Sequence, residues 1–235
     1  LSFFFINIDF RSFLTIINHG TKNQQSGKEI RMGKLEMKKQ KKKDALFNTA
    51  FELFTTKGTN QTTISDIVNK AGVAKGTFYL YFKDKYDIRN KLVSHKTSEL
   101  FYQAYRAIIE QEITGFRKQL HFMIDFILDA LQKDSSLLVF ISRNLSWGVF
   151  QTALEDQIPN EDLIFYEAYL ELLEKDECTY DHPDMLLFSV IELASSTCYS
   201  CILYQQPVSL DEYLPYLHQS IDGILDSYTH KEAEL

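Results

Sequence analysis

Apolar residues recur at helical spacing in the segment DALFNTAFELFTTKG, residues 44–58, which follows a run of lysines. They fall at the intervals at which one face of a helix repeats, and they are Ala45, Leu46, Ala50, Phe51, Leu53 and Phe54. Gly58 is suited to end the helix because glycine readily adopts the left-handed conformation of a C-cap. The pattern predicts a first amphipathic helix that ends near Gly58.

Two shorter helical patterns follow. Thr63 and Asp66 have the spacing of a capping box, which marks a helix start. The apolar residues after this signal make one buried side, at Ile64, Ile67, Val68 and Ala71. Gly72 breaks this helix, and residues 75–82 form a second one because residues 84–87 carry the start signal of the next. Two short helices joined by a turn that contains glycine predict a helix-turn-helix.

The rest of the chain has helical periodicity and no run of strict alternation typical of strands. The predicted helices occupy residues 85–110, 116–132, 136–150, 160–175, 183–204 and 210–228. Pro215 falls inside the last of these and is expected to kink it or delay its start. The chain is therefore predicted to be all-α, with an N-terminal extension (1–36), a three-helix domain with the helix-turn-helix (37–86) and a larger helical domain (87–235).

Charge is divided unevenly along the chain. Residues 32–96 hold 14 Lys and Arg against 6 Asp and Glu, a net +8, whereas residues 97–235 hold 7 against 24, a net −17. The total of −7 therefore conceals a basic segment that suits a phosphate backbone. The acidic segment either stays away from that partner or only aids solubility.

The first residues invite a separate hypothesis. Residues 1–31 are apolar in part, but they carry Asp9 and Arg11 and lack the basic start and cleavage pattern of a signal sequence. We expect them to be translated upstream DNA, with the natural start at Met32 or Met37. The lysines that follow predict either an arm that contacts DNA or a solubilising tail: Lys34, Lys38, Lys39, Lys41, Lys42 and Lys43.

The remaining composition limits the chemistry. Three cysteines, at Cys178, Cys198 and Cys201, do not form a disulfide framework and suit a reducing cytoplasm. The pair Cys198 and Cys201 has no second pair at metal-site spacing, so we expect packing rather than a metal. No apolar stretch reaches the length of a membrane span. The scattered histidines show no catalytic spacing, and neither an enzyme nor a cofactor is expected.

The block ISDIVNKAGVAKGTFYLYFKDKYDI, residues 64–88, resembles the signature of the TetR family. The resemblance covers about 45 residues, starting near Asp44. It implies an all-helical homodimer with an N-terminal DNA-binding domain of three helices. It also implies a C-terminal domain that binds a small effector and dimerises.

The second helix of a helix-turn-helix enters the major groove, so its exposed side chains must reach base edges or phosphates. The residues predicted for this contact are Lys75, Gly76, Thr77, Tyr79 and Tyr81. Thr77 is expected to read a base and the two tyrosines to bind phosphates, although the tyrosines could instead belong to a small aromatic core. Phe78 and Phe82 are expected to face that core.

The resemblance adds phosphate contacts next to this helix. Lys85 would clamp a phosphate, as would Thr62 or Thr63 at the start of the preceding helix, where free N–H groups favour an anion. Ala74 departs from the serine that the family often has, which removes an N-cap hydroxyl worth about 1 kcal/mol and puts one phosphate contact in doubt.

Aromatic residues are frequent in the acidic part, and a helical bundle that binds an apolar molecule needs such walls with a few polar groups. The residues predicted to line an effector site are Phe122, Phe126, Phe140, Asn144, Trp147, Tyr166 and Tyr169. The effector is expected to be apolar or aromatic, and the excess of Asp and Glu favours a cation. Each aromatic residue could instead belong to the core.

The segment LLFSVIELASSTCYSCILY places small residues along one stripe, which together with the last helix predicts a two-fold dimer interface. An internal packing seam is the alternative. The interface residues are expected to be Leu187, Ile191, Ala194, Ser195, Cys198, Ile202, Leu217, Ile221 and Leu225.

These observations favour a repressor that leaves a pseudo-palindromic double-stranded operator when a small molecule binds the C-terminal domain. A DNA-binding protein controlled by a protein partner, or with a structural role on the chromosome, is the alternative.

Overall fold

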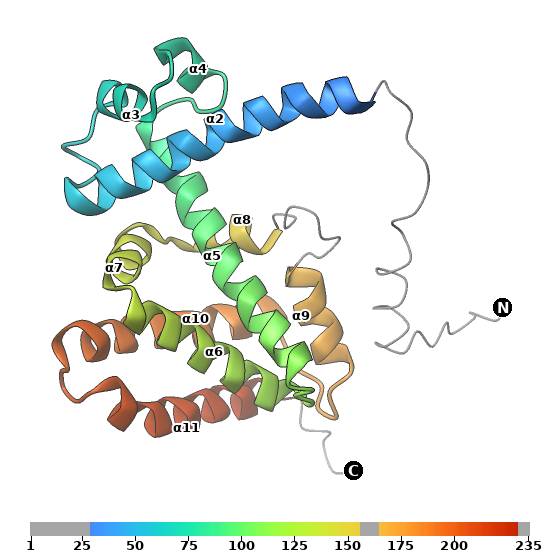
Figure 1. Ribbon diagram of the computed structural model, residues 1–235. Helices are drawn as coiled ribbons and strands as arrows, with labels where there is room; N and C mark the ends of the chain where they lie inside the picture. The colour runs from blue at the N-terminus through green and yellow to red at the C-terminus, as the bar shows by residue number, and fades with distance from the viewer. Residues whose placement is uncertain (1–28, 156–164, 230–235) are drawn as a thin grey trace, which may run out of the picture. The chain divides into compact units, whose positions relative to one another are not determined.

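The computed structural model describes residues 29–155 and 165–229 (Figure 1), with side chains described at 37–154 and 165–229. Within these ranges the chain is helical, apart from one isolated bridge between Tyr180 and Thr229, so the predicted all-α class is confirmed. The helices are α2 (Glu29–Thr56), α3 (Ile64–Ala71), α4 (Lys75–Tyr79), α5 (Lys85–Glu110), α6 (Phe116–Lys133), α7 (Ser135–Asn144), α8 (Trp147–Glu155), α9 (Phe165–Glu174), α10 (Pro183–Tyr204) and α11 (Leu210–Tyr228).

The chain divides at Asp44 into two compact units. The first unit contains the lysine-rich part of α2, where Lys38, Lys39, Lys41 and Lys42 are exposed. The hypothesis that residues 1–31 are translated upstream DNA falls almost entirely outside the described residues, which begin at Glu29. The second unit, residues 45–235, contains both the helix-turn-helix and the helices after it, so the boundary predicted near residue 86 falls inside this unit.

The second half of α2, α3, α4 and the start of α5 share one small core. Its buried members come from each of these elements, as the apolar spacing predicts, and include Leu46, Ala50, Phe54, Ile67, Val68, Phe78, Phe82, Ile88 and Leu92. Short helices have little stability of their own, so burial of these faces holds α3 and α4 in place.

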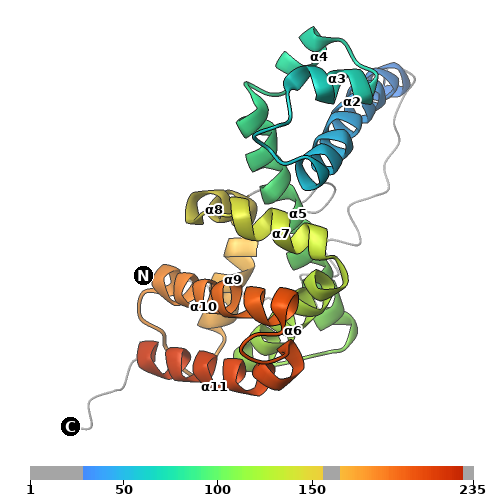
Figure 2. The ribbon, with the colours of Figure 1, turned by 90° about the vertical axis from the view of Figure 1, so that its left-hand side faces the viewer.

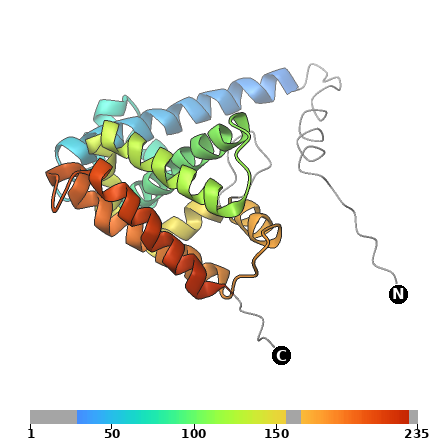
Figure 3. The same cartoon turned by 90° about the horizontal axis from the view of Figure 1, so that it is seen from below.

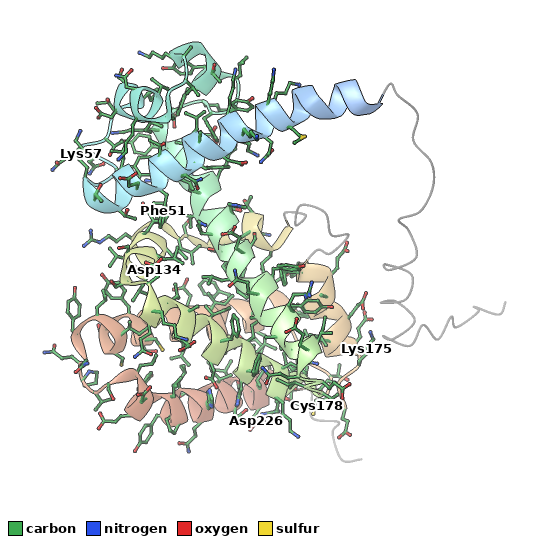
Figure 4. All side chains as sticks on the ribbon, in the orientation of Figure 1. Phe51, Lys57, Asp134, Lys175, Cys178 and Asp226 are labelled. Atoms are coloured by element: carbon green, nitrogen blue, oxygen red, sulfur yellow. The ribbon has the colours of Figure 1, made fainter. Side chains whose placement is uncertain are left out.

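Phe140 of α7 joins this core to the rest of the unit. It is only 3% exposed. Its ring meets Phe51 edge-on at 5.3 Å and stacks on Phe54 at 6.4 Å between centroids. In Figure 4 the label of Phe51 marks the side of α2 that faces α7. The prediction that Phe140 lines an effector site is therefore corrected: its ring is buried where α7 packs on the helix-turn-helix.

The other helices form the larger part of the unit. In Figure 2 the long helix α5 leads from the helix-turn-helix down to α6, while α7 and α8 lie between the two ends of this part. Seen from below in Figure 3, α10 and α11 run side by side. Their core with α6 contains, among others, Ile124, Leu128, Val190, Cys198, Leu217 and Ile221.

Helix α11 begins at Leu210 despite Pro215 in its second turn. Ser209 accepts from the N–H of Glu212, and the Glu212 side chain accepts in return from the N–H of Ser209. This capping box stabilises the first turn. The expected delay of the helix does not occur.

Among the described helices, α10 is long and apolar enough to cross a membrane by composition, with a mean hydropathy of 1.6 in its most apolar window. The helix packs on α6, α7 and α11. Its exposed positions include Met185, Phe188, Glu192, Ser195 and Ser196, so the face that the subunit leaves uncovered mixes apolar and polar side chains.

Candidate nucleic-acid interface

The start of α3 is held by a capping box. Thr63 is the exposed N-cap; its Oγ1 accepts from the N–H of Asp66 at 3.1 Å, and its own N–H donates to Asp66 Oδ2 at 2.9 Å. The backbone N–H of Thr63 and the ammonium of Lys57 lower the pKa of Asp66 to about 2. The carboxylate therefore stays charged at neutral pH and fixes the first turn.

Thr62 lies beneath this turn. It is 0% exposed, and its hydroxyl donates to the carbonyl of Gly58 at 2.8 Å and to that of Leu53 at 3.3 Å. A side chain that is buried and bonded to two carbonyls does not reach a phosphate. The predicted phosphate contact through Thr62 is therefore corrected. Thr63 stays the predicted phosphate contact at the start of α3.

The turn between α3 and α4 depends on Gly72. This residue has φ 67°, in the left-handed region that glycine adopts without strain. Its N–H and that of Val73 donate to carbonyls of α3, which closes the helix. Ala74 is the N-cap of α4 and makes no side-chain cap bond, in line with the missing hydroxyl noted in the sequence.

Helix α4 is shorter than predicted and ends at Tyr79 instead of at residue 82. Beyond it, the N–H groups of Tyr81 and Phe82 both donate to the carbonyl of Phe78. This tight turn brings Phe78 and Phe82 onto the same core, where both are buried. The prediction that these two rings face inward is confirmed.

The opposite side of α4 faces solvent. Lys75 and Gly76 are exposed, Thr77 is half-buried, and Tyr79 is 52% exposed. A Cβ at Gly76 would meet no atom within 4 Å, so the fold itself does not require glycine there. Leu80, which the sequence did not single out, is 79% exposed at the end of the helix. Helix α4 thus presents a polar, basic and aromatic surface.

Tyr81 differs from Tyr79. It is half-buried and packs against the helix-turn-helix core, with its ring 6.2 Å from that of Phe82. Part of this side chain therefore belongs to the core, the alternative that the sequence left open.

The side chain of Lys85, at the start of α5, is bonded within the protein. Its ammonium donates to the carbonyls of Thr59 at 3.0 Å, Asn60 at 3.0 Å and Thr62 at 3.2 Å. An ammonium has three N–H donors, so all of them are satisfied by the turn before α3. In this structure Lys85 ties that turn to α5, which is a different role from the predicted phosphate clamp.

The residues predicted for an effector site do not all meet. Trp147, Tyr166 and Tyr169 share one cluster between α5, α8, α9 and α10, with Phe150, Leu154, Phe165 and Leu187 as its buried members. Burial raises the pKa of Tyr169, whose hydroxyl donates to the carbonyl of Pro183 at 2.9 Å. The sequence missed Phe101 and Tyr105, whose spacing of four residues on one helix was the available signal.

The other predicted members lie elsewhere. Phe122 and Phe126 pair with each other on α6 at 6.2 Å, outside this cluster. Asn144 donates to the carbonyl of Phe140 within α7 at 2.7 Å.

The predicted dimer residues also divide. Five of them are buried in the subunit's own core, namely Leu187, Cys198, Leu217, Ile221 and Leu225. They are corrected to internal packing: Cys198 and the apolar stripe of α11 belong to the core of α6, α10 and α11 of the same chain, and Leu187 belongs to the aromatic cluster. Ile191, Ala194 and Ile202 are half-buried, and Ser195 is exposed. Burial also raises the pKa of the Cys198 thiol to about 11.

Helix α4 has an outward basic and aromatic face and is joined to the capped helix α3 by the turn at Gly72. This arrangement defines a helix-turn-helix protein. Residues 46–92 match the family described as bacterial regulatory proteins, tetR family. The chain carries the N-terminal domain of that family, and the resemblance inferred from the sequence is confirmed.

Curated relatives agree with this assignment. The chain is 29% identical over 136 residues to the uncharacterized HTH-type transcriptional regulator YvdT of Bacillus subtilis, covering 57% of this chain and 64% of that protein. It is 31% identical over 129 residues to the fatty acid metabolism regulator protein of the same organism, covering 55% of this chain and 62% of that one. The matches thus span less than two thirds of both relatives.

A solved structure supports the fold. The FadR regulator of Bacillus subtilis, determined in complex with stearoyl-CoA, has a TM-score of 0.54 and 20% identity to this chain. The match covers 75% of this chain and 96% of that one.

Proposed function

We propose that the protein is a TetR-type transcription regulator that binds double-stranded DNA and acts in the cytoplasm. The observation that carries the proposal is the division of α4 into a buried and an exposed side. Phe78 anchors the helix inward while Lys75 and Tyr79 face solvent. In the major groove such a helix places Gly76 and Thr77 toward base edges and Lys75 toward the phosphates. Tyr79 then lies along the phosphates.

Charge supports this orientation. Lys75 and Lys83 are exposed on either side of the outward face of α4. Lys57 and Lys70, by contrast, are engaged by Asp66 at 3.1 Å and Glu52 at 2.5 Å. Of these four lysines, Lys75 and Lys83 are therefore the ones available to phosphates, and Thr63 offers the start of α3 as a further contact.

The protein acts as a homodimer in this proposal, because a palindromic operator requires two reading helices. The exposed face of α11 is suited to the contact. On α11 the exposed face carries Tyr216, which is 66% exposed, together with Ser220 and Gly223. A Cβ at Gly223 would meet no atom within 4 Å of the same subunit, so the residue leaves room for a second helix. These residues replace the buried ones predicted from the sequence.

A small molecule that binds the C-terminal helices releases the operator in this proposal. The aromatic cluster around Trp147 and Phe165 contacts α5, the helix whose first turn belongs to the helix-turn-helix core. A ligand that repacks the cluster therefore acts on the element that carries α4. Control by a protein partner is the alternative; it predicts operator release without any small molecule.

The test is a gel shift with DNA that flanks the protein's own gene, with and without candidate effectors. Lys75→Ala should weaken binding to every sequence and reduce the salt dependence by about one unit. Lys118→Ala, an exposed lysine on α6, is the matched control and should change neither. Binding that is equal in the two variants would refute the role of α4.

Gly223→Leu tests the dimer contact in the same assay. The leucine side chain fills the space left for the second helix, so the dimer should dissociate, as sedimentation would show. A variant that stays dimeric would refute this interface.

A further inference from the structure

Two aromatic rings and a carboxylate form a corner at the outer end of the aromatic cluster. Asp184 and Phe188 lie four residues apart on α10 and so share a face. The ring of Trp147, from α8, stands at 90° to that of Phe188 with centroids 5.0 Å apart. From α9, the hydroxyl of Tyr166 donates to Asp184. Three helices thus supply two perpendicular rings beside a carboxylate that Tyr166 holds in place.

This corner is open to solvent. Phe188 is 41% exposed and Asp184 is also exposed, whereas Trp147 and Tyr166 are half-buried. Tyr166 holds the carboxylate beside the rings instead of leaving it free to turn away.

The surroundings favour a positive ligand. Between residues 165 and 192 the chain holds eight acidic residues, Glu167, Glu171, Glu174, Asp176, Glu177, Asp181, Asp184 and Glu192, against the single basic residue Lys175. Lys175 is itself 3.3 Å from Glu171. This excess of negative charge attracts cations and repels anions such as the phosphates of an acyl-CoA.

We propose that Trp147, Tyr166, Asp184 and Phe188 bind an organic cation with an apolar body, of the quaternary ammonium type. Such a cation is attracted by the faces of aromatic rings, which carry negative charge, and by the carboxylate beside them. The proposal deepens the proposed function, because it rests on the chain being a regulator with an effector and names the class of that effector.

The corner is connected to the helix that carries the helix-turn-helix. Trp147 stacks on Phe150 at 5.7 Å, and Phe150 meets Phe101 of α5 edge-on at 5.7 Å. A cation that moves Trp147 therefore shifts α8 against α5, so occupation of the corner can bias the position of α4.

Trp147 is the single tryptophan of the chain, so its fluorescence reports on this site alone. The full chain is titrated with benzyltrimethylammonium, with its neutral carbon isostere neopentylbenzene and with the anion phenylmethanesulfonate. Only the cation should quench Trp147 with saturation. Stearoyl-CoA is the fourth arm and should not compete with the cation.

Two variants locate the site. Phe188→Ala removes one ring face and should weaken the cation about two- to fivefold, the range expected of a cation near an exposed aromatic ring. Asp184→Asn keeps an acceptor for Tyr166 but removes the charge, and should weaken the cation by a similar factor. Glu192→Gln, which removes the same charge from an exposed position further along α10, is the control and should bind as the parent does.

Equal affinity for the cation and the neutral isostere would overturn the proposal, as would unchanged binding in Asp184→Asn. Displacement of the cation by stearoyl-CoA would overturn it in favour of an anionic effector. Because this titration contains no DNA, it can fail while the gel shift succeeds. The gel shift can likewise fail while the cation binds.

Discussion

The helix-turn-helix and the helices after it differ in how far apart in the sequence their interacting residues lie. In the first region, the side chains proposed to contact DNA all lie between Thr63 and Lys83, on and beside α3 and α4. In the second, the aromatic cluster joins α5, α8, α9 and α10, which are separated by tens of residues. The function of the first region is therefore local in sequence, whereas that of the second depends on which helix faces meet.

The largest effect is expected where the two regions join. Phe140→Ala removes a buried ring that packs on Phe51 and Phe54, and should lower the free energy of unfolding by about 3–5 kcal/mol in urea denaturation. Phe122→Ala, a half-buried ring on α6 outside this junction, is the control and should cost clearly less. Equal losses in the two variants would show that the regions do not depend on this contact.

Tyr79 separates binding from stability. Tyr79→Ala should weaken operator binding by about 1.5–3 kcal/mol, the range for a hydrogen bond to a charged group. Because the side chain is half-exposed, unfolding should change by no more than about 0.5 kcal/mol. Fluorescence anisotropy with operator DNA and a urea titration measure the two quantities. A large loss of stability with unchanged affinity would assign Tyr79 to the core.

Lys85 should behave in the opposite way. Lys85→Ala releases the three carbonyls before α3 and should lower the free energy of unfolding by about 1–2 kcal/mol. The salt dependence of DNA binding should stay as in the parent protein. A slope reduced by about one unit would instead restore Lys85 as a phosphate contact.

The smallest effect is expected in acid, on the melting temperature of the parent protein relative to that of Asp66→Asn. The folded-state pKa of Asp66, about 2, lies below its ordinary value of 3.8. The stabilisation by this carboxylate is therefore complete above the ordinary value and is lost as the pH falls from about 4 toward 2. In Asp66→Asn the melting temperature should fall less over this interval than in the parent, while Asp129→Asn, an exposed carboxylate on α6, should follow the parent. Parallel curves for the parent protein and Asp66→Asn would exclude the contribution.

The sequence predicted most of the helices because start and stop signals act within a few residues. The capping box at Thr63 and the turn at Gly72 are such signals. It predicted the inward rings of α4 for the same reason. The helix predicted at residues 136–150 was wrong, since the structure has α7 end at Asn144 and α8 begin at Trp147. Within the helix-turn-helix, the sequence failed for Thr62 and Lys85, whose partners are backbone carbonyls that the fold brings close.

The errors in the larger region have a different cause. Leu217 and Ile221 were assigned to a dimer interface because a stripe of apolar residues looks the same whether its partner is another helix of the chain or a second subunit. The structure shows that α10 and α6 cover this stripe. Likewise Phe140 and Trp147 have similar chemistry, and only their neighbours distinguish a sealed junction from an open corner.

Helix α5 links the aromatic cluster to the helix-turn-helix core. It is one unbroken helix of 26 residues, about 39 Å long at 1.5 Å per residue, and it is shared by both regions. A tilt of ~5° about its C-terminal end would move its first turn by ~3 Å, close to the rise of ~3.4 Å between successive base pairs. Helix α4 would travel with that turn. In the proposed dimer both helices would move, so a small repacking of rings in each subunit would change the separation of the two α4 helices by up to ~6 Å, or about two base pairs.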